Sequence, residues 1–336
     1  MEFFSDPERY LPFIFASLMG VSILIYVILD GFDLGVGILL PLATDEEKDI
    51  MVSSIGPFWD ANETWLVLAI GLLLVAFPVA HGEILGALYL PATIMLIGLI
   101  LRGVAFEFRV KAPPQYKNGW NWAFFAGSLI TALCQGAMLG IYIMGLEYTL
   151  WTIGFAALCA GAITVGYSMI GGTWLAMKTV GDLQVKAIDW SKRGLFGALV
   201  GIGLVSIATP LVSPRIFDKW FTLPELFYLA PIPLITAALT VALWFAIKRL
   251  EDDPRNKPGQ PFYMSMGLFA LSYIGLAYSF YPYVVPEKMT IYDAASATES
   301  LWIILVGTIF VLPTILGYTA LAYYVFRGKA KQLTYY

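Results

Sequence analysis

Residues 11–29 read LPFIFASLMGVSILIYVIL, without a single Asp, Glu, Lys, Arg or His. About 20 apolar residues, at 1.5 Å rise each, cross the roughly 30 Å hydrocarbon core of a bilayer. Backbone groups in hydrocarbon must be hydrogen-bonded within their own segment, so this run predicts a membrane-spanning helix. The ten residues before it include acidic groups and lack a basic leader, so we expect the run to remain in the mature protein.

Eight further runs lack charged residues and His, namely 64–80, 84–101, 118–146, 148–177, 194–214, 226–247, 262–286 and 300–326. Of the 336 residues, 59% are hydrophobic and 13% charged, whereas about a quarter of the residues in a soluble domain are charged. We therefore predict a single all-α membrane domain with nine transmembrane helices, and we exclude an ordinary soluble enzyme. The tripeptide His81-Gly82-Glu83 alone separates the second run from the third, which predicts a tight helical hairpin there.

Nine crossings would place the two termini on opposite sides of the membrane. The positive-inside rule then puts 16 of the 20 Lys and Arg residues on one side and four on the other. This asymmetry predicts an external N-terminus, a cytoplasmic C-terminus and cytoplasmic connections at 43–63, 102–117, 178–193 and 248–261. The net charge of −4 and the lack of a basic cluster give no indication of a nucleic-acid partner.

The chain offers few groups for redox or hydrolytic chemistry. It has one histidine, His81, and two cysteines, Cys134 and Cys159, which lie deep in apolar runs where a disulfide is not expected. A b-type haem most often needs His ligands, and a metal centre needs a cluster of His, Cys or carboxylates. If the protein belongs to an enzyme, we therefore expect the redox chemistry, and any metal, on a partner.

Acidic residues near the ends of the first three spans are the candidate functional groups. Asp30 and Asp33 are three residues apart, so they face the same side of a helix, within or just beneath the membrane. Charges there are costly, and a proton path is one interpretation. The other interpretation is a helix end whose acids cap or reach toward water, with Gly31 and Gly35 permitting close packing.

The segment PFWDANETWL, residues 57–66, leads into the second span. Asp60 and Glu63 have the spacing of a capping box, which by itself is an adequate structural explanation for Asp60. The same turn also supplies Trp59 and Asn62. The sequence leaves both a structural and a functional interpretation open here.

The third span ends in RGVAFEFR, residues 102–109. On a continuous helix Arg102 and Arg109 share one face, and anchors at the membrane surface are the favoured interpretation for both. Glu107 lies about 140–160° away from them, so it needs another partner. Short connections make the first three spans neighbours, and we expect their acids to converge on one polar patch formed by Asp30, Asp33, Asp60 and Glu107.

These motifs resemble subunit II of the cytochrome bd-type quinol oxidases. The match rests on DGFDLGVG at 30–37, PFWDANETWL at 57–66, RGVAFEFR at 102–109, YPYVVP at 281–286 and the terminal helix 313–327. Phe58 replaces a residue that is often His in better-known members, and Glu107 stands where Asp is common. The short loops and the variant at 59–63 are similar to the cyanide-insensitive branch of the family.

The resemblance implies two four-helix bundles, residues 1–147 and 148–290, followed by a peripheral ninth helix and cytoplasmic tail, residues 291–336. It implies a heterodimer with a subunit I that ligates haem b and haem d and holds the quinol site, in a bacterial or archaeal cytoplasmic membrane. That complex would oxidise quinol and reduce oxygen to water with cytoplasmic protons. A structural quinone in this subunit and a small accessory transmembrane peptide are also compatible with the resemblance.

The resemblance carries a proton-path role onto matching positions. Asp30, Asp60 and Glu107 match the acidic positions proposed for a cytoplasmic proton path, with Asp33 as a neighbour. The supporting residues are Trp59 and Asn62 at the mouth, with Arg102 and Arg109 on the adjoining helix. Two alternatives stay open: a haem-free scaffold without a proton role, and a secondary transporter, which would be expected to hold a midplane site between symmetry-related broken helices.

Overall fold

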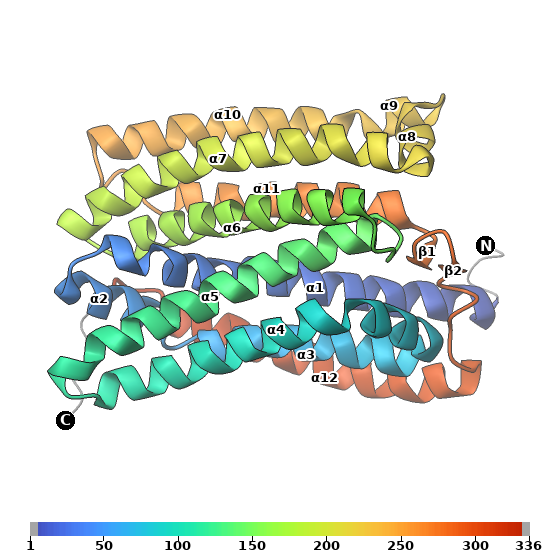
Figure 1. Ribbon diagram of the computed structural model, residues 1–336, viewed down its shortest axis with the longest axis horizontal. Helices are drawn as coiled ribbons and strands as arrows, with labels where there is room; N and C mark the ends of the chain where they lie inside the picture. Colours follow the sequence, from blue (N-terminus) through green and yellow to red (C-terminus); the bar gives the residue numbers. More distant parts are fainter. Residues whose placement is uncertain (1–5, 331–336) are drawn as a thin grey trace.

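The computed structural model describes residues 6–330 as an all-α bundle in which long helices run side by side (Figure 1). Nine of the described helical segments are long and apolar enough to span a membrane, as predicted. They are α1 (Pro7–Leu39, extended by the short 3-10 helix η2, Leu40–Leu42), α3 (Trp59–Ala76), α4 (Pro78–Lys111), α5 (Pro114–Ile143), α6 (Leu150–Lys178), α7 (Asp182–Val212), α9 with α10 (Glu225–Leu229 and Pro231–Asp252), α11 (Gln260–Phe280) and α12 (Thr298–Val325).

The remaining elements lie at the two ends of the bundle. At one end, α2 (Asp45–Ile55) follows η2, and the described chain terminates nearby (Figure 1). At the other end lie α8 (Pro214–Phe221) and an antiparallel pair of short strands, β1 (Tyr283–Val285) and β2 (Met289–Thr290). The two ends of the described chain, near residues 6 and 330, therefore lie at opposite ends of the bundle, as an odd number of crossings requires. The side of the membrane that each end faces stays a prediction.

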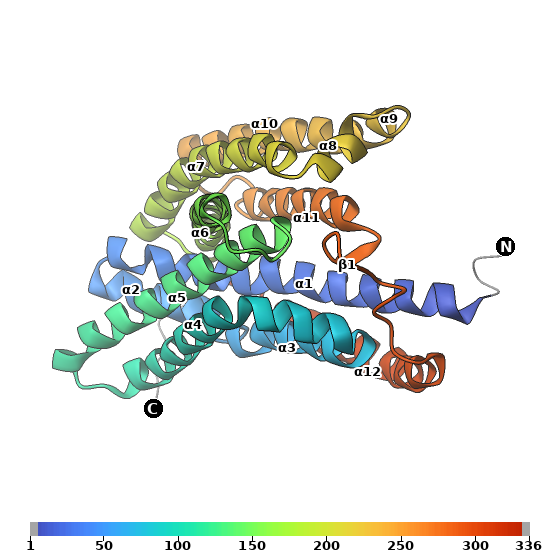
Figure 2. The same cartoon turned by 45° about the vertical axis from the view of Figure 1, so that its right-hand side comes forward.

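Helix α1 is the central element of the fold. It begins at Pro7, and the Asp6 side chain caps it by accepting a hydrogen bond from the Glu8 amide at 3.0 Å. In both views α1 runs between α6 and α11 on one side and α3 and α4 on the other (Figures 1 and 2). Residues 30–37 are consequently all buried, including both acids of the first motif.

The turn between α3 and α4 lies four residues earlier than predicted. Helix α3 ends at Ala76, Phe77 adopts φ −136° and ψ 60°, and α4 begins at Pro78. Proline lacks an amide hydrogen and is favoured in the first turn of a helix, so Pro78 starts a new helix within the apolar run. His81 and its two neighbours are therefore part of α4 and do not form the hairpin turn.

The eighth apolar run also ends differently from the prediction. Helix α11 stops at Phe280, and the rest of the run, to residue 286, forms β1 and a turn. Pro282 and Pro286 both lie in this stretch, and a proline cannot donate the amide hydrogen that a continuing helix needs. A single uncharged run therefore covers both a helix and the strand that follows it, and hydropathy alone does not separate the two.

Close backbone contact joins α1 to α6. A Cβ atom on Gly171 would lie 2.6 Å from the Val36 amide nitrogen, a distance that real Cβ contacts essentially never reach. Small residues at such crossings allow membrane helices to approach closely and to gain van der Waals contact. The predicted packing role of Gly35 is confirmed, because its Cα would lie 2.8 Å from the same added Cβ atom.

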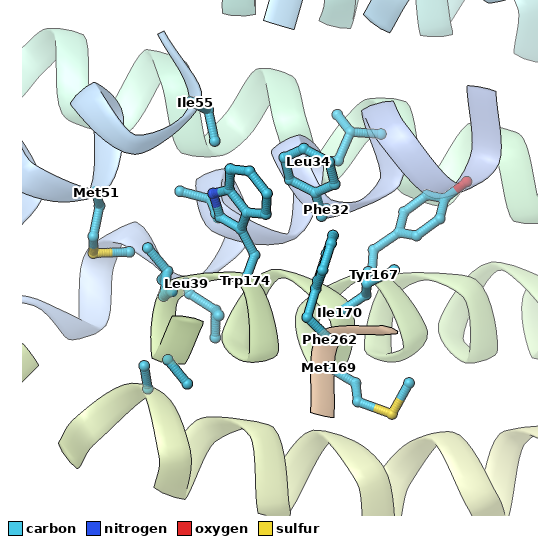
Figure 3. Packing of buried hydrophobic residues seen from close by; sticks show 14 of the residues in the cluster. Phe32, Leu34, Leu39, Met51, Ile55, Tyr167, Met169, Ile170, Trp174 and Phe262 are labelled. Carbon is cyan, nitrogen blue, oxygen red and sulfur yellow. The ribbon is translucent and has the colours of Figure 1, made fainter. Parts of the chain in front are cut away.

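Aromatic side chains fill the core near the α2 end (Figure 3). The Phe32 ring stacks on Trp174 at a centroid distance of 4.2 Å, and Phe262 meets Trp174 edge-on at 5.1 Å. Met51 and Ile55 of α2 are fully buried in the same cluster. Helix α2 therefore closes this end of the bundle with its apolar face, although it does not span the membrane.

Helix α12 is the most exposed span, with 6% of its apolar window buried. At the strand end, the Ser296 amide before it donates to the Ala76 carbonyl at 2.8 Å. At the other end, Lys178 donates to the Phe326 carbonyl at 2.6 Å. The helix is thus attached mainly at its two ends, and the predicted division of the other spans into two four-helix bundles stays a prediction.

Candidate functional site

Two fully buried charged side chains form the centre of the site. Arg102 of α4 and Asp30 of α1 are both 0% exposed, and Arg102 Nη2 lies 2.7 Å from Asp30 Oδ1. The same nitrogen lies 3.1 Å from Oε1 of Glu63, which belongs to α3 and is one-quarter exposed. The Trp59 ring covers the guanidinium at 5.9 Å. Arg102 is therefore a buried ion-pair partner, and its interpretation as a membrane-surface anchor was wrong.

A second set of hydrogen bonds holds Asp33. The Asn62 amide nitrogen donates to Asp33 Oδ2 at 2.7 Å, and the Tyr323 hydroxyl donates to the Asn62 amide oxygen at 3.0 Å. The Tyr323 ring in turn stacks on Phe58 at 4.4 Å. Helices α1, α3 and α12 thus meet at Asn62, whose side-chain amide donates a hydrogen bond to the Asp33 carboxyl and accepts one from the Tyr323 hydroxyl.

The site carries more negative than positive groups. Asp30, Asp33 and Glu63 face one guanidinium, and desolvated charges are stable only when they are paired and hydrogen-bonded. Within residues 6–330, Asp30 Oδ2, Asp33 Oδ1 and two nitrogens of Arg102, Nε and Nη1, have no hydrogen-bond partner. Such a set of unsatisfied donors and acceptors can take up water molecules and can exchange protons.

Asp60 and Glu63 do not form the capping box that their spacing suggested. Helix α3 begins at Trp59, and its N-cap residue, Phe58, makes no side-chain capping bond. Asp60 lies in the first turn with an exposed side chain, while Glu63 turns inward to Arg102. The difference arises because Glu63 finds a buried cation on α4, which sequence spacing within α3 cannot reveal.

Glu107 does not join the other acids. Its side chain is 59% exposed and lies 3.9 Å from Lys111, one turn further along α4. The prediction that Glu107 points away from both arginines of its helix is confirmed, because Arg102 and Arg109 are buried on the other face. The predicted convergence therefore holds for Asp30 and Asp33, which lie in one buried site with Glu63, and fails for Asp60 and Glu107, whose side chains are exposed.

Arg109 belongs to a separate cluster that attaches α2 to the bundle. Its Nη2 atom donates to Asp49 Oδ1 at 2.7 Å and its Nε atom donates to Asn121, so it is not a surface anchor either. Lys117 of α5 donates to the other oxygen of Asp49 at 2.7 Å. Partial burial opposes ionisation of Asp49, but the hydrogen bonds from Lys117 and Arg109 outweigh it and hold the pKa of that carboxyl below its usual value.

Sequence reasoning missed a hydrogen-bonded polar chain that reaches α1 one turn before Asp30. The Gln135 side chain on α5 donates from Nε2 to the Tyr26 hydroxyl at 2.6 Å, and the Tyr167 hydroxyl on α6 donates to Gln135 Oε1 at 2.6 Å. Tyr26 precedes Asp30 by four residues, so both face the same side of α1. That spacing was the available signal, but buried tyrosines are common in membrane spans and did not stand out.

The described part of the chain does not fit a haem or metal ion as a resident group. No cluster of three or more His, Cys, Asp or Glu residues within 6–330 could hold a metal ion. His81 lies near the start of α4, roughly 30 Å along the helix from Arg102. Cys134 and Cys159 are free thiols, as expected.

Fold and site together define a polytopic helical membrane protein with a buried carboxyl and arginine site at one end. The family model "Cytochrome bd terminal oxidase subunit II" matches residues 11–326, and the chain belongs to this family. It is therefore a multi-pass membrane subunit of a bd-type terminal oxidase, an oxidoreductase complex that implies a partner subunit I.

Individual relatives agree with this assignment. Cytochrome bd ubiquinol oxidase subunit 2 of Bacillus subtilis (strain 168) is 28% identical over 334 residues, which cover 93% of this chain and 94% of the relative. Cytochrome bd-I ubiquinol oxidase subunit 2 of Escherichia coli (strain K12) is 28% identical over 362 residues, covering 95% of each. A chain of the bd oxidase from Geobacillus thermodenitrificans has the same fold, with a TM-score of 0.76, 18% identity and coverage of 94% and 98%.

Proposed function

We propose that the complex containing this chain oxidises quinol and reduces oxygen to water, and that its buried acids relay protons toward the partner subunit. The observation that carries the proton role is the excess of carboxyl groups, Asp30, Asp33 and Glu63, around the single guanidinium of Arg102. A buried carboxyl without a full counter-charge is costly unless it binds a proton. The surplus groups are therefore suited to gain and release protons.

The mouth of the proposed path lies at the α2 end. Glu63 is one-quarter exposed, and Asp60 at the start of the same helix is exposed, so the two acids lead from the surface toward Asp30. Trp59 lines the guanidinium side of this entry. We place Glu107 on the exposed surface of the subunit and outside the path itself, since its side chain lies on the face of α4 that points away from Arg102. The distribution of Lys and Arg supports a cytoplasmic position for this end.

We place the haems, the quinol site and the reduction of oxygen on subunit I of a heterodimer in the bacterial inner membrane. Haem supplies electron transfer and oxygen reduction when it is bound there. The residues of this chain contribute by holding protons at Asp30, Asp33 and Glu63 and by fixing their positions through Arg102 and Asn62.

The test is oxygen consumption by the purified complex in two variants, Asp30→Asn and Glu63→Gln. Each removes a proton-binding group while keeping the shape of the side chain, and we expect turnover to fall at least about tenfold, because a positioned acid or base is typically worth 10²–10⁴-fold. The reduced haem spectra should stay intact. Asp189→Asn is the matched control, since Asp189 sits in an exposed pair with Arg193 on α7.

The outcomes separate the alternatives. Unchanged turnover in both variants would contradict the proton role and would leave this subunit as a scaffold. Loss of the haem spectra together with turnover would mean that the acids support assembly. A complex purified through this chain without any haem absorption would overturn the oxidase function itself.

A further inference from the structure

The hydrogen-bonded chain of Tyr167, Gln135 and Tyr26 ends beside Asp30, and it belongs neither to the ion pairs nor to the entry from the surface. Tyr26 is 3% exposed and Tyr167 is 1% exposed, so both phenols are removed from water. The chain joins three helices, from α6 through α5 to α1.

The two hydrogen bonds of Gln135 have a fixed direction. Its Oε1 atom accepts from Tyr167, and its Nε2 atom donates to the Tyr26 oxygen. A phenol has one hydrogen, and because the Tyr26 oxygen already accepts from the amide, that hydrogen remains free to be donated elsewhere. The orientation of the amide therefore makes Tyr26 a donor at the end of the chain.

Asp30 is the acceptor in reach of that donor. It lies one helical turn beyond Tyr26, the two side chains interact electrostatically, and Asp30 Oδ2 has no hydrogen-bond partner within residues 6–330. The ring of Tyr167 also packs against α1 beside Asp30, because a Cβ on Gly31 would lie 2.7 Å from its Cε1 atom. Tyr167 therefore forms the α6 wall of the site.

We propose that Tyr26 is a positioning residue, oriented by Gln135 and Tyr167, that donates a hydrogen bond to the Asp30 carboxyl and holds it against Arg102. The Asp30 carboxyl then has two partners, the guanidinium of Arg102 on α4 and the hydroxyl of Tyr26 on its own helix. This inference deepens the proton role proposed above and rests on it.

A test of this hydrogen bond must leave the other charged and titratable groups around Asp30 unchanged. The charged and titratable neighbours are Asp33 on α1, Glu63 on α3, Arg102 on α4, Tyr167 on α6 and Tyr323 on α12. None of these is altered by Tyr26→Phe, which removes one oxygen atom and leaves the ring in place. The substitution therefore removes the proposed hydrogen bond to Asp30 together with the one that the Tyr26 oxygen accepts from Gln135. Gln135→Leu removes the second bond and keeps the phenol, so the two variants together separate the two effects.

The experiment uses infrared difference spectra of the complete complex, recorded between its oxidised and reduced states. The bands of the Asp30 carboxyl are those that Asp30→Asn removes. We expect Tyr26→Phe to shift these bands and to lower turnover about tenfold, the usual scale for a hydrogen bond to a charged group. Tyr142→Phe is the matched control, because that partly buried phenol donates to the Val284 carbonyl at the strand end of the bundle.

A graded series of variants tests the hydrogen-bonded chain of Tyr167, Gln135 and Tyr26. Gln135→Leu should shift the same bands less than Tyr26→Phe, and Tyr167→Phe should shift them least, because each change lies one hydrogen bond further from Asp30. Unmoved bands in Tyr26→Phe, or equal shifts in Tyr142→Phe, would overturn the inference. Its failure differs from failure of the proton role, which would show as unchanged turnover in Asp30→Asn.

Discussion

Arg102 Nη2 lies 2.7 Å from Asp30 Oδ1, and neither side chain is exposed. One cation from α4 and one anion from the central helix are thus fixed against each other in the interior. Removing one partner of a buried pair leaves the other charge unpaired, which is far more costly than losing the attraction itself.

Replacing Arg102 should therefore destabilise the subunit strongly. We expect Arg102→Leu to cost about 3–5 kcal/mol, since it leaves Asp30 without a counter-charge. Arg193→Leu serves as control, because Arg193 is 79% exposed in its pair with Asp189 and should cost less than about 1 kcal/mol. Thermal unfolding of the purified complex measures both. Equal melting temperatures for the two variants would contradict a structural role for the buried pair.

The attachment of α2 should depend on pH through Asp49. Its folded-state pKa lies below the ordinary value, so its ion pairs contribute stability that is complete above the unfolded pKa of about 3.9 and is lost as pH falls through the folded pKa. Hydrogen exchange of the α2 amides should accelerate in that acid window. Asp49→Asn should give fast exchange already at neutral pH, whereas Glu46→Gln, on the exposed face of α2, should behave as wild type.

The close crossing of α1 and α6 should not tolerate an added methyl group. Gly171→Ala places a Cβ 2.6 Å from the Val36 nitrogen, and overpacking of this kind costs about 1–3 kcal/mol. Gly161→Ala is the matched control on the same helix, because nothing lies within 4 Å of a Cβ added there and alanine favours helix by about 0.5–1 kcal/mol. The two variants should shift the melting temperature of the complex in opposite directions. A stabilised Gly171→Ala variant would show that the helices can separate without cost.

The end of α12 should loosen when Lys178 loses its charge. The Lys178 ammonium donates to the Phe326 carbonyl and lies 5.2 Å from the centre of the Trp174 ring, so it ties α12 to the aromatic core. We expect Lys178→Met to speed hydrogen exchange in the last turns of α12 at least several-fold. Lys111→Met, which removes an ammonium 78% exposed at the surface, should leave that exchange unchanged. Unaltered exchange in Lys178→Met would mean that apolar packing alone holds this end.

Several features of the site were predictable because they depend on local spacing. The shared face of Asp30 and Asp33 follows from helical geometry, and so does the orientation of Glu107 away from Arg102. The pairing of Glu63 with Arg102 was not predictable, since the two residues lie on different helices. The spacing of Asp60 and Glu63 also offered a local explanation for both acids, a capping box at the start of the second span. The chain formed by Tyr26, Gln135 and Tyr167 was hidden because its residues likewise lie on different helices.

The sequence by itself determined the class of protein and the number of spans, because in hydrocarbon each run of about 20 apolar residues must satisfy its own backbone hydrogen bonds. Local stereochemistry also limited where helices could begin, as at Pro78. Only the tertiary structure decided which acids are buried together and which cation they share. Those relationships depend on how α1, α3 and α4 pack together, and that packing brings side chains far apart in the sequence, such as Asp30, Glu63 and Arg102, into contact.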